Sequence, residues 1–331
     1  MRTPCSVVVA VLCTAFLRAY GDSLPAEVLE KARSASVEVL IRDQLRGGGA
    51  IVENEAGKAF VITAAHLFRS PKETSQVITH DGKEHFASLS SYDQGHDLAL
   101  LEVEPSLSET YGFLSVASSP PPVSNQIYNL GPALKRRTLI IPGAVSDDRI
   151  SYTDFAETKG HLAHFFVSGI NPVLTSGGVW INTKGKIVGV QHGRLIGDKG
   201  APSSGLSMVS PPAAIRNLIS SNSVTSTPGI GGYLWELWSA DPPFIRKFPP
   251  GTRGLIVNPI FSGGPLDRAG LRALDLIVAC DGHPLRRRSD LLKRIRSAPT
   301  GTEFTLSFIR PGGNQVRKAT LRTESLESLW Q

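Results

Sequence analysis

The stretch from Gly48 to His66, GGAIVENEAGKAFVITAAH, consists of two short apolar runs joined by a polar turn that contains Asn54 and Gly57. Similar short runs, such as SVEVLIRD, DLALLEVE and GKIVGVQHG, recur between Ser34 and Val209, and Gly, Pro, Asn and Asp separate them. Many short strands at such spacing are typical of an all-β barrel or sandwich. Helix signals lie only at the edges of this region, over Pro25–Ala32 and Pro211–Ile219.

A stretch rich in Ser, Thr, Pro and Gly, SSNSVTSTPGIGG from Ser220 to Gly232, interrupts the strand pattern. Such a composition predicts a linker. Beyond it, the sequence predicts a helix over Ser289–Ala298, with Ser289 as its N-cap. It also predicts three strands, over Gly254–Ile260, Leu276–Asp281 and Phe304–Ile309. A second, smaller α+β domain therefore follows the first.

The length and composition are those of a globular protein with a leader. The chain has 331 residues, of which 41% are apolar and 19% are charged, and this length suggests roughly two domains. The start combines a basic Arg2 with an apolar run from Ser6 to Leu17, which predicts a secretory signal over residues 1–21. A retained membrane anchor is the rival interpretation. It is weaker because about 12 apolar residues are too few to span roughly 30 Å of hydrocarbon.

Cysteine usage bears on the compartment. Cys5 and Cys13 fall inside the predicted signal, so the mature chain keeps only Cys280 and no intramolecular disulfide is expected. An exported protein without disulfides fits a bacterial periplasm better than an animal extracellular space.

Positive charge gathers near the end of the chain. The net charge of +6 includes Arg2 and Arg18 of the leader, so the remaining excess is modest. The predicted C-terminal helix region holds Arg286, Arg287, Arg288, Lys293, Arg294 and Arg296. This cluster lacks interleaved aromatic residues, so we interpret it as a solvated helix face rather than a nucleic-acid site.

Three distant segments each supply one member of a charge-relay site. The run VITAAH ends on His66, the run GHDLALL places Asp97 at the start of an apolar strand, and NPVLTSGGVW contains Ser176. A serine hydroxyl is barely acidic, so an imidazole must take its proton while a carboxylate orients that imidazole. A buried carboxylate in turn needs a donor such as His66.

These segments resemble a known family. TAAH, HDLALLEV and INPVLTSGGVWINTKGKIVGV are similar to the three catalytic motifs of the HtrA/Deg family, trypsin-like serine proteases that are commonly periplasmic. The resemblance covers about residues 30 to 220 and includes Gly47–Val52 and Gly205–Pro211. It implies a chymotrypsin/trypsin-like double six-stranded β-barrel over residues 22–219. It also implies that His66 is the general base, Asp97 its orienting residue and Ser176 the nucleophile, with no cofactor.

The nucleophile loop departs from the family pattern. Most members carry glycine two residues before the serine, whereas this chain has Leu174 and one extra residue. The resemblance places the oxyanion hole at Leu174, Thr175 and Ser176. If the productive geometry needs a positive φ, leucine costs about 1 to 3 kcal/mol of strain. The alternative is therefore an impaired pseudoprotease that acts as a peptide-binding or chaperone-like protein.

The resemblance also suggests a specificity pocket. Ile170, Leu174, Leu206 and Met208 are candidates for its lining, and no acidic residue stands at its expected base. A small-to-medium apolar P1 side chain is the expected preference. Trp180 is interpreted as a packed barrel residue rather than a substrate contact.

The C-terminal motifs resemble a PDZ domain of the protease-associated type over residues 231–322. After a linker at 220–230 they comprise GGYLWEL, GLIV, GPLDRAGL and LDLIVACDG, and residues 323–331 form a tail. The resemblance implies binding of extended C-terminal or exposed peptides by strand addition. Candidate binding residues are Gly232, Tyr233, Leu234, Trp235, Leu237, Leu292 and Ile295.

Trp235 stands where this loop usually has glycine, and its role has three interpretations. It could plug the groove or offer an aromatic platform to a ligand. Alternatively, Tyr233, Trp235 and Trp238 seal the domain against the barrel.

The expected function is that of an exported endopeptidase that cleaves unfolded or damaged proteins through an acyl-enzyme. Expected partners are misfolded polypeptides and C-terminal peptides, and the segment Ser23–Arg46 could support a homotrimer. Neither nucleic acid nor a stable membrane anchor is expected. His161 and His164 have helical spacing, but no paired cysteines or carboxylates join them, so no metal site is predicted.

Overall fold

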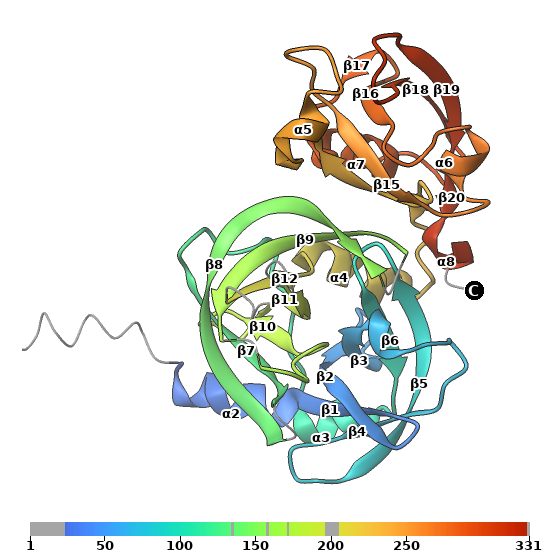
Figure 1. Ribbon diagram of the computed structural model, residues 1–331. Coiled ribbons are helices and arrows are strands. Elements are labelled where there is room, and N and C mark those ends of the chain that lie inside the picture. Colours follow the sequence, from blue (N-terminus) through green and yellow to red (C-terminus); the bar gives the residue numbers. More distant parts are fainter. Residues whose placement is uncertain (1–23, 134–135, 157–158, 171, 196–204, 330–331) are drawn as a thin grey trace, which may run out of the picture.

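The computed structural model describes residues 24–133, 136–156, 159–170, 172–195 and 205–329, which form a two-barrel body and a C-terminal domain above it (Figure 1). The predicted signal, residues 1–21, lies outside the described residues. Among the helices that are described, none is both long and apolar enough to span a bilayer.

The first barrel is a closed ring of six strands in the order β1-β2-β3-β6-β5-β4. All its pairings are antiparallel, and every residue of AFVITA in β3 is buried. Helix α2, the 3-10 turn η1 and helix α3 complete this part. The bounds are α2 Ala26–Ala35, β1 Ser36–Ile41, β2 Gln44–Glu53, β3 Ala59–Ala64, η1 Ala65–Leu67, β4 Ser75–Ile78, β5 Glu84–Asp93, β6 Leu98–Glu102 and α3 Ser106–Tyr111.

The second barrel is a closed ring in the order β10-β11-β12-β9-β8-β7. Its longest strand, β8, has 20 residues and arches beneath the C-terminal domain (Figure 1). Helix α4 follows the last strand. The bounds are β7 Gln126–Ala133, β8 Arg136–Phe155, β9 Gly160–Gly169, β10 Val179–Ile181, β11 Ile187–Arg194, β12 Leu206–Val209 and α4 Pro212–Ser221.

One buried hydrophobic cluster joins the two barrels, and the second barrel has a further cluster of its own around Trp180. Ile62 and Leu100 of the first barrel belong to the same buried cluster as Leu130 and Val190 of the second and Ile215 of α4. Each fully buried side chain of this kind stabilises the fold by about 1.5–3 kcal/mol relative to an exposed one. This shared core holds the barrels in a defined relation, so loops at their junction can form a site.

The C-terminal domain is a six-stranded sheet in the order β14-β15-β16-β18-β19, with β17 paired to β16. Helix α7 covers it through the buried residues Leu291, Leu292 and Ile295. The bounds are β13 Pro228–Gly229, β14 Gly232–Glu236, η4 Leu237–Ser239, α5 Pro242–Ile245, β15 Leu255–Ile260, α6 Pro265–Arg268, β16 Leu276–Cys280, β17 His283–Pro284, α7 Arg288–Arg296, β18 Glu303–Ile309, β19 Arg317–Arg322, β20 Glu324–Ser325 and α8 Leu326–Leu329. The predicted fold, a double six-stranded barrel followed by a small α+β domain, is confirmed.

Two local predictions differ from the structure. Ser289 is not the N-cap of α7, because the helix begins at Arg288 and the carboxylate of Asp290 accepts the backbone N–H groups of Arg286 and Arg287, both at 2.9 Å. The expected linker and tail also carry structure, since β13 pairs with β20. A carboxylate in the first turn satisfies exposed N–H groups as well as a serine cap does.

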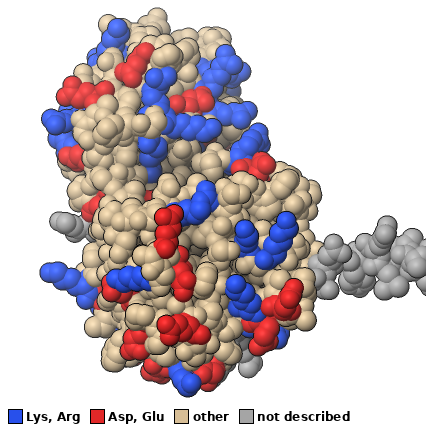
Figure 2. All heavy atoms as spheres, turned by 180° about the vertical axis from the view of Figure 1, so that it is seen from behind, with Lys and Arg blue, Asp and Glu red and all other residues tan. Residues whose placement is uncertain are grey.

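Helix α7 ties the C-terminal domain to the second barrel. The Arg296 guanidinium donates to the His161 carbonyl oxygen at 2.6 Å, and Arg288 lies 3.3 Å from the Asp154 carboxylate. Two of the six basic residues of the predicted solvated face therefore lie at the domain interface. On the face shown in Figure 2, acidic groups also lie among the Lys and Arg groups of the upper body.

Candidate active site

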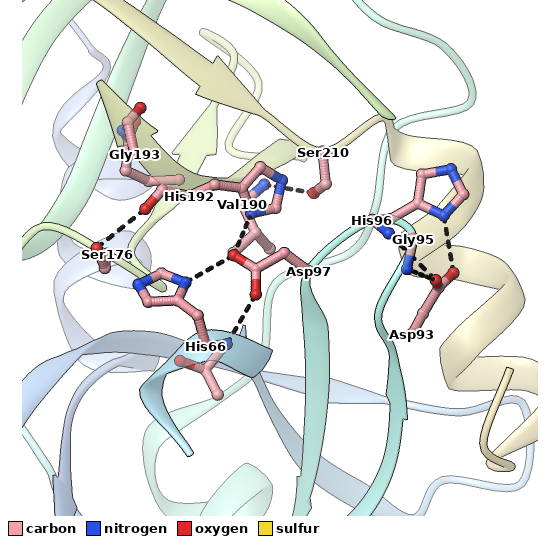
Figure 3. Close-up of polar contacts among 12 residues, drawn as sticks. His66, Asp93, Gly95, His96, Asp97, Ser176, Val190, His192, Gly193 and Ser210 are labelled. Carbon is pink, nitrogen blue, oxygen red and sulfur yellow. Dashed lines mark hydrogen bonds and ion pairs between the residues drawn. The ribbon is translucent and has the colours of Figure 1, made fainter. Parts of the chain in front are cut away.

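Strand pairing brings His66 and Asp97 together. Strand β3 pairs with β6 so that Ala64 lies opposite Leu98, and His66 follows the first strand while Asp97 precedes the second. The imidazole Nδ1 lies 2.7 Å from Asp97 Oδ2, and the backbone N–H of His66 donates to Asp97 Oδ1 at 2.7 Å (Figure 3). The register of two neighbouring strands thus builds the first half of the site.

Asp97 is a fully buried carboxylate held by donors. Burial alone raises its pKa, but the attraction of His66 and the hydrogen bonds from His192 and His66 outweigh burial, so the pKa of Asp97 falls well below its ordinary value. The carboxylate is therefore ionised at neutral pH. An ionised acceptor keeps the proton of His66 on Nδ1 and leaves Nε2 able to act as a base.

A second imidazole, which the sequence analysis missed, also bonds Asp97. His192 Nδ1 lies 3.1 Å from Asp97 Oδ2, and this buried ring comes from β11 (Figure 3). Burial lowers the pKa of His192, so the ring is neutral and donates through Nδ1. Its Nε2 is buried and has no hydrogen-bond partner among the described residues. In the sequence, the sole signal was a histidine near the end of the run GKIVGVQHG.

The nucleophile loop lies where the two barrels meet. The backbone N–H of Gly48 donates to the Ser176 carbonyl oxygen at 2.9 Å, and that of Gly177 donates to Gln191 at 2.8 Å. The Ser176 hydroxyl donates to the His192 carbonyl oxygen at 3.0 Å (Figure 3). The structure thus brings His66, Asp97 and Ser176 to one junction, with the serine turned toward β11.

The backbone of the nucleophile loop meets the condition under which strain is expected at Leu174. Leu174 has φ +74°, in the left-handed region that favours glycine. Among the described residues, no acceptor is present for the backbone N–H of Leu174 or Ser176. Two such N–H groups are what an oxyanion needs. Thr175 is buried, and its hydroxyl donates to the Pro172 carbonyl oxygen at 2.9 Å.

We expect the free energy of unfolding of Leu174→Gly to be about 1 kcal/mol higher than that of Leu174→Ala. Only the alanine variant keeps a Cβ atom in the left-handed region. Comparing these two variants removes the contribution of the leucine side chain. Urea unfolding monitored by circular dichroism measures the difference. Equal midpoints for the two variants would mean that this φ is not retained in solution.

The candidate specificity residues lie on the second barrel but differ in exposure. Ile170 directly follows β9 and is 76% exposed, Leu206 is half-buried, and Met208 is buried. Strands β9 and β12 pair, with Leu206 opposite Ser168. The half-buried Phe155 of β8, which was not predicted, stands edge-on to the His66 ring at 5.6 Å. Trp180 is a barrel-core residue, as expected, and its indole N–H bonds Gln191.

The candidate peptide-binding residues do not form one group. Leu234, Leu292 and Ile295 share a buried cluster, whereas Leu237 packs in another cluster with Phe248. Gly232 is buried and pairs with Ile260 of β15.

The three aromatic residues between positions 233 and 238 also differ in their surroundings. The Trp235 indole donates to Asp154 of β8 at 3.1 Å, and Tyr233 stands edge-on to His161 of β9. Trp238 is 66% exposed. These contacts favour the sealing interpretation for Tyr233 and Trp235.

Metal ligation has no support within the residues that the structure describes. No group of three or more His, Cys, Asp or Glu side chains there could hold an ion. His161 Nε2 lies 3.2 Å from Asp154, and His164 Nε2 lies 2.8 Å from the Thr153 hydroxyl. Both histidines are therefore engaged in structural contacts.

Three buried histidines predict loss of stability in acid. Burial lowers the pKa of His161 and His192, and it lowers that of His164 to about 3. Below about pH 6.5 the unfolded chain takes up protons that the folded chain does not. The unfolding free energy then falls by up to about 1.4 kcal/mol per pH unit for each histidine.

Urea titrations between pH 7.5 and 4.5 measure this slope. His164→Gln should reduce it, whereas His283→Gln, at an exposed position, should leave it unchanged. A wild-type midpoint that is constant over this range would contradict the expectation.

Comparisons with known proteins bear on the family and the fold. The family described as trypsin-like peptidase domain matches residues 47–190, and the PDZ domain family matches residues 236–323. The chain is 26% identical over 280 residues to a probable periplasmic serine endoprotease DegP-like of Chlamydia trachomatis, covering 82% of this chain and 52% of that protein. It is 25% identical over 329 residues to the periplasmic pH-dependent serine endoprotease DegQ of Escherichia coli, covering 95% and 65%. The chain thus spans about half to two thirds of the length of these relatives.

Solved structures show the same fold at low identity. The HtrA-type protease AlgW with a decapeptide aligns with a TM-score of 0.63 and 16% identity, covering 91% of this chain and 98% of that one. A serine endoprotease from Yersinia pestis aligns with a TM-score of 0.58 and 17% identity, covering 92% and 99%.

Proposed function

Because this chain belongs to the HtrA/Deg family of trypsin-like serine proteases with a C-terminal PDZ domain, we propose that it is an endopeptidase acting through an acyl-enzyme on Ser176. Its substrates under this proposal are unfolded or damaged proteins. The single observation that carries it is the 2.7 Å contact between His66 Nδ1 and the buried Asp97, beside the Ser176 hydroxyl at one junction.

The proposed reaction follows from these contacts. Rotation of the Ser176 side chain about its Cα–Cβ bond moves the hydroxyl from the His192 carbonyl oxygen toward His66 Nε2. His66 takes the proton as the serine attacks the substrate carbonyl, and Asp97 holds the imidazolium that forms. The N–H groups of Leu174 and Ser176 are available for the oxyanion. His66 then returns the proton to the leaving amine, and water hydrolyses the ester.

The remaining roles come from the family and from the sequence. The relatives named above are described as periplasmic, and together with the predicted signal this supports export of the chain to the periplasm or beyond. We propose that the PDZ domain binds C-terminal or exposed peptides, and the solved complex of AlgW with a decapeptide supports this role by analogy. Assembly into a homotrimer through Ser23–Arg46 is a further part of the proposal.

A second candidate function has an observation in its favour. The Ser176 hydroxyl donates to the His192 carbonyl oxygen, and Leu174 has a left-handed backbone conformation that strains leucine. A catalytically impaired chain that binds peptides or acts like a chaperone would tolerate both features. Under that alternative, Ser176→Ala would leave function in cells unchanged.

A fluorophosphonate probe and an unfolded protein substrate test the proposal directly. We expect the probe to attach to Ser176, located by mass spectrometry, and the protein to degrade the substrate. Ser176→Ala should lose both activities, while Ser223→Ala, at an exposed serine, should keep both. An unlabelled Ser176 together with an intact substrate would favour the peptide-binding alternative.

A further inference from the structure

A cavity opens beside the nucleophile on the side of the first barrel. Its volume is about 330 Å³, and Ser176, His66 and Leu174 line it together with first-barrel residues. The charged residues among these are three arginines and one glutamate, Arg42, Arg46, Arg69 and Glu73. The cavity lining therefore carries a net charge of two positive units beside Ser176.

The Glu73 carboxylate already has partners within the protein. Glu73 is 4% exposed, pairs with Arg42 at 2.8 Å, and accepts the backbone N–H of Arg69 at 2.7 Å. Within the described part of the chain, Arg46 donates only to the neutral Gln44 side chain, at 2.8 Å. Among the described residues, the Arg69 guanidinium has no carboxylate within ion-pair distance. Arg46 and Arg69 are both exposed, so their charges remain available to a ligand.

The position of the cavity indicates which half of a substrate it meets. Of the four candidate specificity residues, Leu174 of the nucleophile loop lines this cavity. Ile170, Leu206 and Met208 do not, and the last two lie on β12 of the second barrel. A polypeptide that places its acyl side against the second barrel continues past Ser176 toward β1 and β2. The residues after the scissile bond then lie in the arginine-lined cavity.

We propose that Arg46 and Arg69 form a subsite for an acidic side chain on the leaving-group side of the scissile bond. This inference rests on the proposed function and adds a substrate class to it. A guanidinium binds a carboxylate through charge-assisted, often bidentate hydrogen bonds. The same charge attracts acidic segments toward the cleft before they bind.

Matched internally quenched peptides test the subsite. They share one acyl half and carry Glu, Gln or Lys at the first or second position after the cleaved bond. We expect kcat/KM for Glu to exceed that for Gln by about 3- to 10-fold, the range of one or two partly exposed ion pairs. Raising the salt from about 0.05 to about 0.5 M should shrink the ratio because the charges are screened.

Variants assign the preference to the two arginines. Arg46→Gln and Arg69→Gln should each lower the Glu-to-Gln ratio, and the double variant should bring it near one. Arg253→Gln, at an exposed arginine of the C-terminal domain, is the matched control and should keep the wild-type ratio. A wild-type ratio of one, or a preference that survives in the double variant, would overturn the subsite.

Binding to Ser176→Ala separates this inference from the proposed function. Fluorescence anisotropy of the same peptides needs no turnover, and the Glu peptide should bind about 3- to 10-fold more tightly than the Gln peptide. Equal cleavage and equal binding of the Glu and Gln peptides would refute the subsite and leave the endopeptidase proposal standing. Absence of any cleavage, with Glu-selective binding retained, would refute the endopeptidase and keep the subsite.

Discussion

Asp97→Asn is expected to lower kcat by about 10⁴-fold while the protein stays folded. Asp97 Oδ2 accepts from two imidazoles, His66 at 2.7 Å and His192 at 3.1 Å. An asparagine NH₂ group in that place has two hydrogens to donate, so both rings would move their proton to Nε2 and accept at Nδ1. The network would survive, but His66 Nε2 would carry a proton and could not take one from Ser176.

Steady-state kinetics with a peptide substrate and urea unfolding measure the two halves of this expectation. Asp147→Asn, which removes only a surface pair with Arg149, serves as the control and should retain wild-type kcat. If Asp97→Asn kept more than a tenth of wild-type kcat, the orienting role of Asp97 would be wrong. A large fall in the free energy of unfolding would instead mean that the two histidines do not change tautomer to accept hydrogen bonds from the asparagine.

Gly177→Ala is expected to lower kcat by about 100-fold or more and to cost about 2–4 kcal/mol of stability. Gly177 has φ +77°, and an added Cβ would overlap the Thr63 hydroxyl and the Gly48 carbonyl oxygen. These two groups are themselves hydrogen-bonded at 2.7 Å across β2 and β3. The methyl group would therefore push the nucleophile loop away from the first barrel, and a displacement of about 1 Å suffices for such a loss of rate.

Gly57→Ala isolates the backbone contribution. Gly57 has φ +76°, but an added Cβ there meets nothing within 4 Å. This control should lose about 1 kcal/mol of stability from strain and keep its kcat. Equal effects of the two substitutions on kcat and on the urea midpoint would show that close packing at Gly177 is not what places the serine.

The sequence was sufficient for features that arise from local interactions. Alternating and continuous apolar runs predicted the strands, including β3 and β15, because side-chain direction repeats along each strand. The motifs around His66, Asp97 and Ser176 identified the family. Strain at Leu174 followed from the sequence only as a condition, and the φ of +74° in the structure meets that condition. Even locally there was a limit, since Asp290 rather than Ser289 caps α7.

Only the tertiary structure decided which distant groups meet. His192 reaches Asp97 across 95 positions of the sequence, Trp235 reaches Asp154 across 81, and Leu237 packs apart from Leu292. That Arg46 and Arg69 keep their charges available beside Ser176 likewise depends on Glu73 being paired with Arg42 in the fold. Such contacts depend on strand register and on how the barrels and the PDZ domain pack together. The sequence motifs and their resemblance to the family therefore identified the candidate triad, but its hydrogen-bond partners and the charge around it required the fold.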